Sequence, residues 1–431
     1  NVMAKTGDSN GKFDLFLEKL LGIFFSKDKK EERILIFLLL IGFIIRLFAS
    51  LNMNVTADDM VYASQSAGVI NAKILSTHSH PALFFYLTDF AYKIFGYTTF
   101  ASRLSPLIAG TMLILVVFLI AKLFFNKKIA LIAAGFTALS SFLTRMVFTE
   151  QGLITLFFAF SGTYFGLLYL NGKNKKFLIS SAVFFGLGML TKYNTAFFIA
   201  AFLLFSCYFI KKKNEKIFSK DNLKKLLVFS AIILIFALPF LSFNYFIYKE
   251  KGFMDYQFNK IFKPERGVEL NKAIGGHYES LIQDILKPGN YVNYKLVYQT
   301  DWVIFILGLF GLALLVKRKE KMFLAFFFLF LIIPFILQSA NILPKHYAFM
   351  HLLFAMAAGY GAFFVFDKMK NTPLKVLFIS VLVALMVINL GNTYGTPHDL
   401  FYESATSSLK SFINTNVKSE GHLTAEELVE A

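Results

Sequence analysis

The sequence predicts an all-α polytopic membrane protein with about eleven transmembrane helices, and three observations support this prediction. Hydrophobic residues make up 56% of the chain, including 55 Phe, and the mean hydropathy is +0.59. Apolar runs recur that are long enough to cross a hydrocarbon core of about 30 Å, which takes roughly 20 helical residues. Clusters of basic residues fall in alternate connections between these runs. A soluble core would not need so many apolar segments.

Each span is expected where an apolar run is bounded by polar residues or a turn. Several of the runs are shorter than about 18 residues, so the number of spans depends partly on whether the charges between them alternate. We expect spans near residues 34–51, 104–124, 129–143, 152–170, 177–191, 195–210, 226–248, 302–316, 322–342, 347–366 and 374–390.

The basic clusters do alternate along the chain. By the positive-inside rule, the connections that carry them are cytoplasmic. The two long connections, 52–103 and 249–301, then lie outside. The clusters are Lys27 to Arg33 before the first span, then Lys127-Lys128, Lys173 to Lys176, Lys211-Lys212-Lys213, Lys317-Arg318-Lys319, and Lys368 with Lys370.

Four parts of the chain follow from this topology. Residues 1–33 form a cytoplasmic amphipathic segment, in which 13–25 are too short to span and are expected to lie on the interface rather than act as a cleaved signal peptide. Residues 34–210 form a first transmembrane module, and residues 211–390 form a second one that contains the extracytoplasmic loop 249–301. Residues 391–431 form an acidic extracytoplasmic tail.

Charge and cysteine content exclude some classes of protein. The formal net charge of +17 comes mainly from short clusters beside the spans, which suits contact with anionic lipid headgroups and not with nucleic acid. The single cysteine, Cys207, lies inside an apolar run. It excludes an intrachain disulfide and a metal cluster of cysteines.

The first outer loop carries the polar residues that favour chemistry. Two adjacent carboxylates, Asp58 and Asp59, follow the first span, and acidic residues at the mouth of a membrane helix are seldom without a role. The apolar, aromatic stretch 81–96 is interrupted by Asp89 and Lys93, which predicts a helix along the outer interface. A loop that folds back in this way would bring together Asp58, Asp59, His78, His80 and Arg103.

Four short motifs in the first half of the chain resemble one family. Asp58-Asp59-x-x-Tyr62 resembles the Asp-Glu-x-x-Tyr element of the protein O-mannosyltransferases and lipid A aminoarabinose transferases, membrane glycosyltransferases of the GT-C fold. The resemblance covers about residues 34–210, and beyond it only Lys345-His346-Tyr347 is similar. The other three motifs are His80-Pro81-Ala82-Leu83, Ala101-Ser102-Arg103-Leu104 and Gly186-Leu187-Gly188-Met189-Leu190-Thr191-Lys192-Tyr193.

The resemblance implies a catalytic GT-C module over 34–210 and a reaction on the extracytoplasmic face of the plasma or inner membrane. The enzyme would move a sugar from a polyprenyl-phosphate donor to an extracytoplasmic acceptor, using a carboxylate base and cations for the leaving phosphate. No cofactor is assigned, and a divalent cation held by the carboxylate pair stays open. The implied catalytic residues are Asp58 as base, Asp59 and Glu150; the donor-phosphate ligands are His80, Arg103, Lys192, Lys345 and His346; the other substrate contacts are Tyr62, His78, Tyr193 and Tyr347.

Other interpretations of the same residues remain. Asp58-Asp59 could cap a helix, and Glu150 could be a carboxylate favoured at a helix start. Arg103 and Lys192 could be snorkelling anchors at helix ends, as we expect for Arg46. Ala82 and Asp59 depart from the family's usual Pro and Glu, which leaves the substrate class open.

Two alternative functions remain as well. A ligase for a whole lipid-linked oligosaccharide would use a similar site. A transporter or lipid flippase would also have many helices, but its ionisable residues are expected near mid-membrane, whereas here they gather at outer helix ends. The loop 249–301 either covers the cavity and chooses the acceptor or is a solvated loop at the headgroups.

Overall fold

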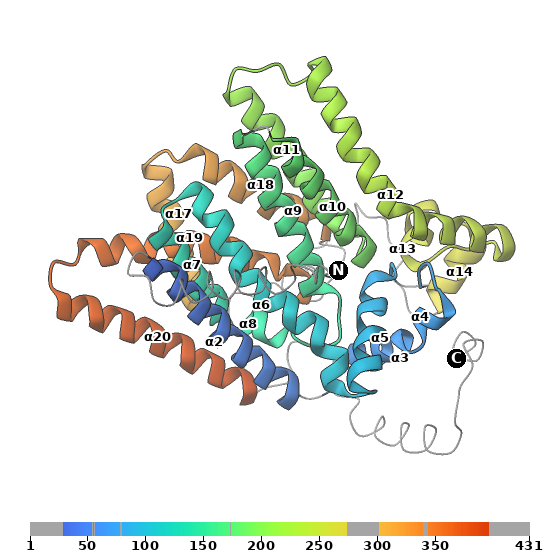
Figure 1. The fold of residues 1–431 in the computed structure, drawn as a ribbon, viewed down its shortest axis with the longest axis horizontal. Helices are drawn as coiled ribbons and strands as arrows, with labels where there is room; N and C mark the ends of the chain where they lie inside the picture. The colour runs from blue at the N-terminus through green and yellow to red at the C-terminus, as the bar shows by residue number, and fades with distance from the viewer. Residues whose placement is uncertain are drawn as a thin grey trace, which may run out of the picture.

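A computed structural model of the chain describes residues 29–395, apart from 54, 56, 78–79, 173, 274–300 and 339–343 (Figure 1). The amphipathic helix predicted over 13–25, and the tail after residue 395, lie outside the described residues. Across the described ranges the structure is helical, and the only β-pairing is an isolated bridge between Ser76 and Pro81.

Apolar helices occupy each of the predicted span positions in the described ranges. Seven of them, α2, α6, α9, α11, α12, α19 and α20, are long and apolar enough to cross a membrane. The polytopic helical fold is therefore confirmed, while the exact number of spans stays a prediction. The helices are α2 (Lys30–Asn52), α6 (Thr99–Phe124), α7 (Lys127–Ala138), α9 (Gly152–Gly172), α10 (Lys175–Thr191), α11 (Thr195–Lys212), α12 (Lys220–Lys251), α17 (Trp302–Lys317), α18 (Lys321–Gln338), α19 (Phe349–Lys368) and α20 (Thr372–Gly395).

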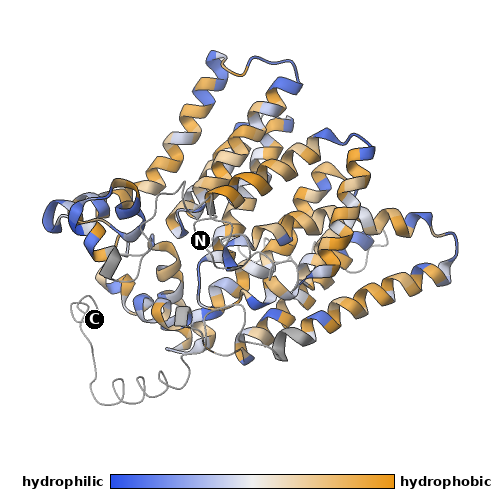
Figure 2. Cartoon of the chain, turned by 180° about the vertical axis from the view of Figure 1, so that it is seen from behind, coloured by the Kyte–Doolittle hydropathy of each residue, from blue (hydrophilic) through white to orange (hydrophobic). Residues whose placement is uncertain are grey.

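The helices form a bundle with a buried centre and an apolar exterior. Hydrophobic colour runs along the helices, and hydrophilic colour collects at the turns that join their ends (Figure 2). Most of α9 and α19 is buried, whereas α12 and α20 expose most of their apolar side chains. Helices that are apolar on their exposed faces are suited to contact with lipid chains.

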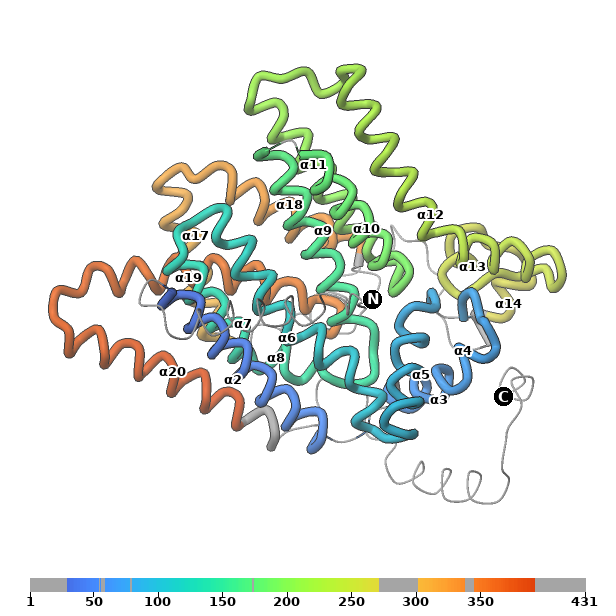
Figure 3. Tube along the Cα trace, viewed as in Figure 1, coloured from blue at the N-terminus to red at the C-terminus, as the bar shows by residue number. Residues whose placement is uncertain are grey.

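Close packing between α17 and α19 depends on glycine. A Cβ atom on Gly311 would lie 2.0 Å from the carbonyl oxygen of Ala357, and one on Gly361 would lie 2.6 Å from that of Leu307. Small residues let membrane helices approach closely enough for backbone contact. Figure 3 shows the backbones of these two helices side by side.

The span predicted over 129–143 is wrong in its last third. The helix α7 ends at Ala138, and a short helix α8 (Ser141–Arg145) begins after a break. The break occurs because the Ser140 hydroxyl accepts a hydrogen bond from the Leu143 N–H at 3.1 Å and caps α8.

Arg46 is not the exposed interfacial anchor that we expected. Its side chain is fully buried and donates to the carbonyl oxygens of Ala138 at 3.1 Å and Thr137 at 2.9 Å. A cation is favourable at the C-terminus of α7, where carbonyl groups lack helical partners. Arg46 therefore joins α2 to the end of α7.

The first long loop forms α3 (Ala57–Ser66), α4 (Val69–Ala72) and α5 (Leu83–Phe95), and the second begins with α13 (Tyr256–Phe262) and α14 (Glu265–Ala273). The helix predicted over 81–96 is confirmed as α5, although its position along the interface stays a prediction. Its Asp89 is buried and accepts from the N–H groups of Gly68 at 3.2 Å and Ile70 at 2.9 Å at the start of α4. Both loop groups lie at the same end of the bundle (Figure 1).

Candidate functional site

The candidate site lies where short segments between helices meet at one end of the bundle. One is the turn from α8 to α9, which carries Glu150, and another is the turn from α10 to α11, which carries Lys192. The third is the short helix η3 (Pro344–Tyr347), with Lys345 and His346 just before α19. His80 from the first long loop lies close enough for its pKa to respond to the charges of this group.

Glu150 and Lys192 form a buried ion pair. The Lys192 Nζ donates to Glu150 Oε1 at 2.5 Å, and Glu150 Oε2 accepts from the N–H of Gly152 at the start of α9. Only 2% of Glu150 and 6% of Lys192 are exposed. A Cβ atom on Gly152 would lie 2.5 Å from Glu150 Oε2, so glycine is needed for the carboxylate to reach this N–H.

Lys345 adds a second ammonium group to this pair. It is 7% exposed, and its Nζ lies 5.9 Å from the centre of the Phe148 ring. Together these groups line a cavity of about 30 Å³ with one carboxylate and two lysines among its described lining residues. The cavity is lined by Glu150, Gly152, Thr155, Leu156, Lys192, Asn194, Phe198, Lys345 and His346.

Burial and the two lysines set the protonation states here. Burial raises the pKa of Glu150, but the Lys192 and Lys345 ammonium groups outweigh it and lower the pKa to about 2. Burial, followed by the positive charge of Lys192, lowers the pKa of His80 to about 3. The same causes lower the pKa of His346 well below its usual value. At neutral pH, Glu150 is therefore charged and both histidines are neutral.

His80 is held in place by Tyr62 and Thr77. The Tyr62 hydroxyl lies 3.1 Å from His80 Nε2, and the two rings are 5.6 Å apart. The backbone N–H of His80 donates to the Thr77 hydroxyl at 3.0 Å, and the Thr77 N–H donates back to the His80 carbonyl at 3.0 Å. His78, which we predicted as a substrate contact, lies outside the described residues.

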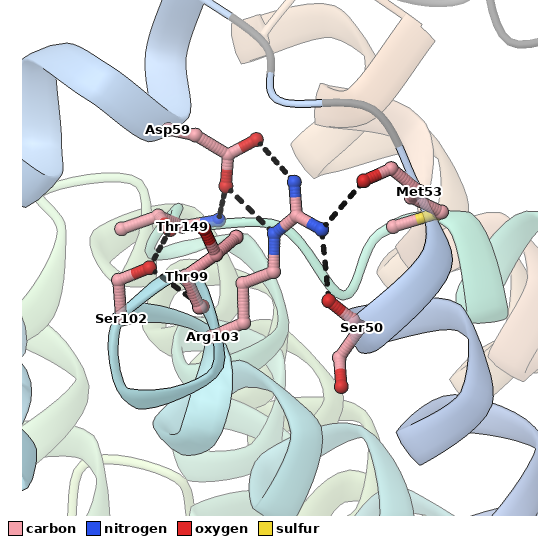
Figure 4. Close-up of polar contacts among 7 residues, drawn as sticks. All are labelled: Ser50, Met53, Asp59, Thr99, Ser102, Arg103 and Thr149. Carbon is pink, nitrogen blue, oxygen red and sulfur yellow. Dashed lines mark hydrogen bonds and ion pairs between the residues drawn. The ribbon is translucent and has the colours of Figure 1, made fainter. Parts of the chain in front are cut away.

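Asp59 and Arg103 form a second buried ion pair, shown in Figure 4. Arg103 Nε donates to Asp59 Oδ1 at 3.1 Å, and its second terminal nitrogen donates to Oδ2 at 2.9 Å. The other terminal nitrogen donates to the carbonyl oxygens of Ser50 at 2.9 Å and Met53 at 3.0 Å. Arg103 is fully buried and Asp59 is 2% exposed.

This second pair bears on two predictions. Arg103 was expected to bind the donor phosphate, but its guanidinium is buried and already engaged by the carboxylate and two carbonyls. Asp59 was expected to be catalytic or to organise the loop, and its geometry fits the second role because its charge is neutralised. Its Oδ1 also accepts from the Thr149 N–H at 2.5 Å, directly before Glu150. The pair fixes the Glu150 turn without lining the cavity.

Three further predicted site residues, Asp58, Tyr193 and Tyr347, have different surroundings. Asp58 is the second residue of α3, next to Asp59, but its side chain lies outside the described residues. Tyr193 donates to Asp255 Oδ2 at 2.5 Å, and its ring packs on Phe240 at 5.1 Å. Tyr347 is fully buried and packs 5.4 Å from the Phe335 ring, and its contact with substrate stays a prediction.

Sequence reasoning missed Asp255, which links the second long loop to this site. Asp255 is buried, which raises its pKa, and it caps α13 through the N–H groups of Gln257 at 3.0 Å and Phe258 at 2.9 Å. Asn244 of α12 donates to it at 2.8 Å. Its only signal was an Asp before a short helix, which is too common to indicate a role.

Sequence reasoning also missed a buried group around Asp301. This carboxylate accepts from the Ser140 hydroxyl at 2.5 Å and the Ser141 N–H at 2.9 Å, and His351 Nδ1 lies 2.8 Å away. The signal was a histidine in an apolar run and an Asp at the start of another. Across the described ranges, no group of three or more His, Cys, Asp or Glu residues is arranged to hold a metal ion.

A model of the family described as dolichyl-phosphate-mannose-protein mannosyltransferase matches residues 79–243 of this chain. That stretch contains His80, Arg103, Glu150 and Lys192 and ends inside α12. A search of curated protein sequences gives no match.

Two kinds of solved structure are similar to the chain. The oligosaccharyltransferase AglB from Archaeoglobus fulgidus, in complex with an inhibitory peptide and a dolichol-phosphate, has a TM-score of 0.60 and 16% identity over 91% of this chain and 58% of that one. ArnT from Cupriavidus metallidurans, bound to undecaprenyl phosphate, has a TM-score of 0.53 and 12% identity over 81% and 63%. The chain thus spans about three fifths of the length of these structures.

At such identities the likeness establishes the fold and not the chemistry. Both relatives are GT-C fold glycosyltransferases. The resemblance that the four motifs predicted is therefore confirmed, and the chain is a multi-pass membrane protein of this fold.

Proposed function

We propose that this protein is a glycosyltransferase that moves a sugar from a polyprenyl-phosphate donor to an acceptor on the extracytoplasmic side of the membrane. The observation that carries the proposal is the buried cluster of Lys192 and Lys345 around Glu150. The match of the mannosyltransferase family model over residues 79–243 supports the same class of donor.

The cluster suits a phosphate group at the surface of a membrane. Two ammonium groups and one carboxylate leave a surplus of positive charge, and in a low-dielectric setting such charges attract an anion more strongly than they do in water. Charge-assisted hydrogen bonds to phosphate are about twice as strong as neutral ones. Lys192 and Lys345 are therefore the proposed ligands of the donor phosphate, with neutral His80 and His346 beside them.

The size of the cavity determines how the phosphate would bind. A volume of about 30 Å³ has room for one or two water molecules and not for a phosphate group. We propose that the donor phosphate replaces Glu150 as the partner of Lys192. This exchange would release the Glu150 carboxylate near the reacting sugar.

The transfer itself needs one base and one leaving group. The acceptor O–H gives its proton to a carboxylate as its oxygen bonds to the anomeric carbon, and the bond from that carbon to the phosphate oxygen breaks with its electrons on the phosphate. Asp58 remains our proposed base, and Tyr62, His78 and Tyr193 remain proposed substrate contacts. Asp59 is left out because Arg103 neutralises it.

A ligase for a lipid-linked oligosaccharide is the second candidate. It is favoured by the likeness to the oligosaccharyltransferase, which has the higher TM-score of the two relatives described. The two candidates share the phosphate ligands and differ in the donor, a sugar monophosphate lipid or an oligosaccharide lipid.

The proposal is tested by following sugar release from a defined donor. The full chain in nanodiscs is given radiolabelled dolichyl-phosphate mannose together with membrane extract as a source of acceptors. We expect label to move to acceptor with the parent protein and to fall by about 10²-fold or more with Asp58→Asn. Transfer that needs an oligosaccharide lipid would favour the ligase, and no turnover of either donor would contradict the proposed class.

A further inference from the structure

A second cavity lies between α9, α10, α11 and α12, away from the candidate site. Its volume is about 210 Å³, and its lining is almost entirely apolar. Cys207, the single cysteine of the chain, is part of the wall. Other lining residues are Leu170, Leu178, Phe202, Leu203 and Phe229.

This cavity lies at the opposite ends of the same helices that carry the site. Along α9, Thr155 lines the site and Leu170 lines the second cavity. Fifteen residues of helix between them span roughly 22 Å at 1.5 Å per residue. Lys192 and Cys207 are separated by the same number of residues. Because the hydrocarbon core is about 30 Å thick, the two cavities belong to opposite leaflets.

The rim of this cavity is basic: Lys225 lines it, and Lys213 lines a smaller cavity that shares Lys225 and Leu170 with it and also contains Glu215. Residues 211–225 contain seven lysines against two acidic residues. Lys213 donates to the carbonyl oxygen of Leu170 at 3.3 Å and lies 4.5 Å above the Phe209 ring, and Lys225 lies 6.0 Å above the Tyr169 ring. Lys225 also pairs with Asp221, whose side chain is 75% exposed. Exposed ion pairs of this kind contribute little to stability, so another anion can replace Asp221 as the partner of Lys225 at a small cost in free energy.

An exposed aromatic residue marks the mouth of the cavity. Phe218 is 93% exposed although it lines the opening. It sits in the connection that also carries the lysines. Aromatic and basic residues together at one level are typical of segments that meet lipid headgroups.

We propose that this cavity binds an anionic phospholipid from the leaflet opposite the candidate site. Part of one acyl chain would fill the apolar space, and the headgroup phosphate would lie between Lys213 and Lys225. An apolar cavity that opens into a basic rim at the membrane surface matches both halves of such a lipid. The inference does not depend on the proposed function.

Cys207 provides the test, because it is the only thiol in the chain and lies in the proposed lipid site. The full chain is placed in nanodiscs of equal parts phosphatidylglycerol and phosphatidylcholine, or of phosphatidylcholine alone, and alkylation of Cys207 by N-ethylmaleimide is timed. If bound lipid leaves about one site in ten open, alkylation in the anionic membrane slows by about tenfold.

Two double variants that remove the same charge distinguish binding in the cavity from a general effect of the surface potential. Lys213→Gln with Lys225→Gln should lose the protection by phosphatidylglycerol. Lys212→Gln with Lys224→Gln should keep it, because these exposed residues, one position away, line neither the apolar cavity nor the smaller cavity that Lys213 and Lys225 share. Equal behaviour of the two double variants, or equal rates for the parent protein in both membranes, would overturn the proposal.

A measurement on the parent protein needs no variant. Native mass spectrometry of protein released from the mixed nanodiscs should retain phosphatidylglycerol in preference to phosphatidylcholine, and equal retention of both would overturn the proposal. Added glycerol 3-phosphate should leave the alkylation rate in phosphatidylcholine unchanged. Protection by this soluble phosphate would mean that the rim binds a free phosphate and not a lipid.

Discussion

Two buried ion pairs lie near each other at one end of this protein, and they differ in what surrounds them. Arg103 and Asp59 neutralise each other, and backbone groups take up further hydrogen-bonding capacity of both residues. Lys192 and Glu150 instead line a cavity that a second ammonium group, Lys345, also faces. At the scale of residues, the first pair is suited to holding segments together and the second to binding an anion.

Removing Arg103 should therefore damage folding more than donor binding. Arg103→Met leaves the Asp59 charge buried without its partner, which typically costs about 3–5 kcal/mol of stability. We expect a large drop in the denaturation midpoint of the protein in detergent. Folded Arg103→Met protein should bind a short-chain prenyl phosphate like the parent, and a selective loss of that affinity with unchanged stability would contradict the structural role.

His80 should make stability fall in mildly acidic solution. Its pKa is about 3 in the folded protein, against about 6.5 in an unfolded chain, so the unfolded state binds a proton that the folded state excludes. Between pH 6.5 and 5 the free energy of unfolding then falls by up to about 1.4 kcal/mol per pH unit for this one group.

His80→Gln should remove that part of the pH dependence. His346 shifts in the same direction, so the slope is expected to become shallower and not to vanish. Glu150→Gln is the control, since the lowered pKa of Glu150 affects stability only below about pH 4.5. Thermal melts at several pH values measure the slopes, and an unchanged slope in His80→Gln would show that this histidine is protonated in the folded protein.

At the scale of elements, capping carboxylates connect parts of the chain that are distant in sequence. Asp255 caps α13 and accepts from Tyr193, the neighbour of Lys192, so the start of the second long loop is joined to the candidate site. Asp301 likewise accepts from Ser140 and the first N–H groups of α8, which leads into the Glu150 turn. Each contact fixes a segment next to Lys192 or Glu150.

Asp255→Ala should loosen α13 while leaving the bundle folded. The loss of the cap and of the bonds from Tyr193 and Asn244 is expected to cost about 2–4 kcal/mol locally. Hydrogen exchange over residues 255–263 should become faster. Asp221→Ala, which removes an exposed carboxylate of α12, is the control and should leave that exchange unchanged. Equal protection in both variants would mean that Asp255 does not anchor the loop.

The sequence allowed the helices to be predicted far better than the contacts between them. Apolar runs identify spans because a lipid environment requires the backbone hydrogen bonds to be made within the helix and the side chains to be apolar. The helix α5 followed from its apolar and aromatic run in the same way. The break at Ser140 was missed because it depends on Asp301. Arg103 was predicted to bind phosphate because its motif places a cation at the start of a helix. The motif does not show that the Arg103 guanidinium is already paired with Asp59. Lys192, Lys345 and Glu150 were brought together as predicted.

At the scale of the whole molecule, the account depends on which side of the membrane each loop faces. The charge pattern predicts that 249–301 is outside and that the lysine-rich connection 211–225 is inside. Cysteines are introduced singly at Glu269 and Lys216, two exposed positions, in a Cys207→Ser background. An impermeant thiol reagent added to intact cells should label position 269 only, and labelling of position 216 would invert the proposed topology.

In the proposed site, Lys192 and Lys345 hold the phosphate of a polyprenyl lipid, and Glu150 competes with that phosphate for the Lys192 ammonium group. Equilibrium binding of a short-chain prenyl monophosphate to the purified protein tests this arrangement. Lys192→Met and Lys345→Met should each weaken binding by about 1.5–3 kcal/mol, roughly 10- to 150-fold, while Lys127→Met on an exposed pair should not.

Glu150→Gln should change the same binding constant in the opposite direction, because it removes the anion with which the phosphate competes. We expect weaker binding in both lysine variants together with tighter binding in Glu150→Gln. Affinities for the prenyl phosphate that are the same in Lys192→Met, Lys345→Met and the parent protein would contradict it.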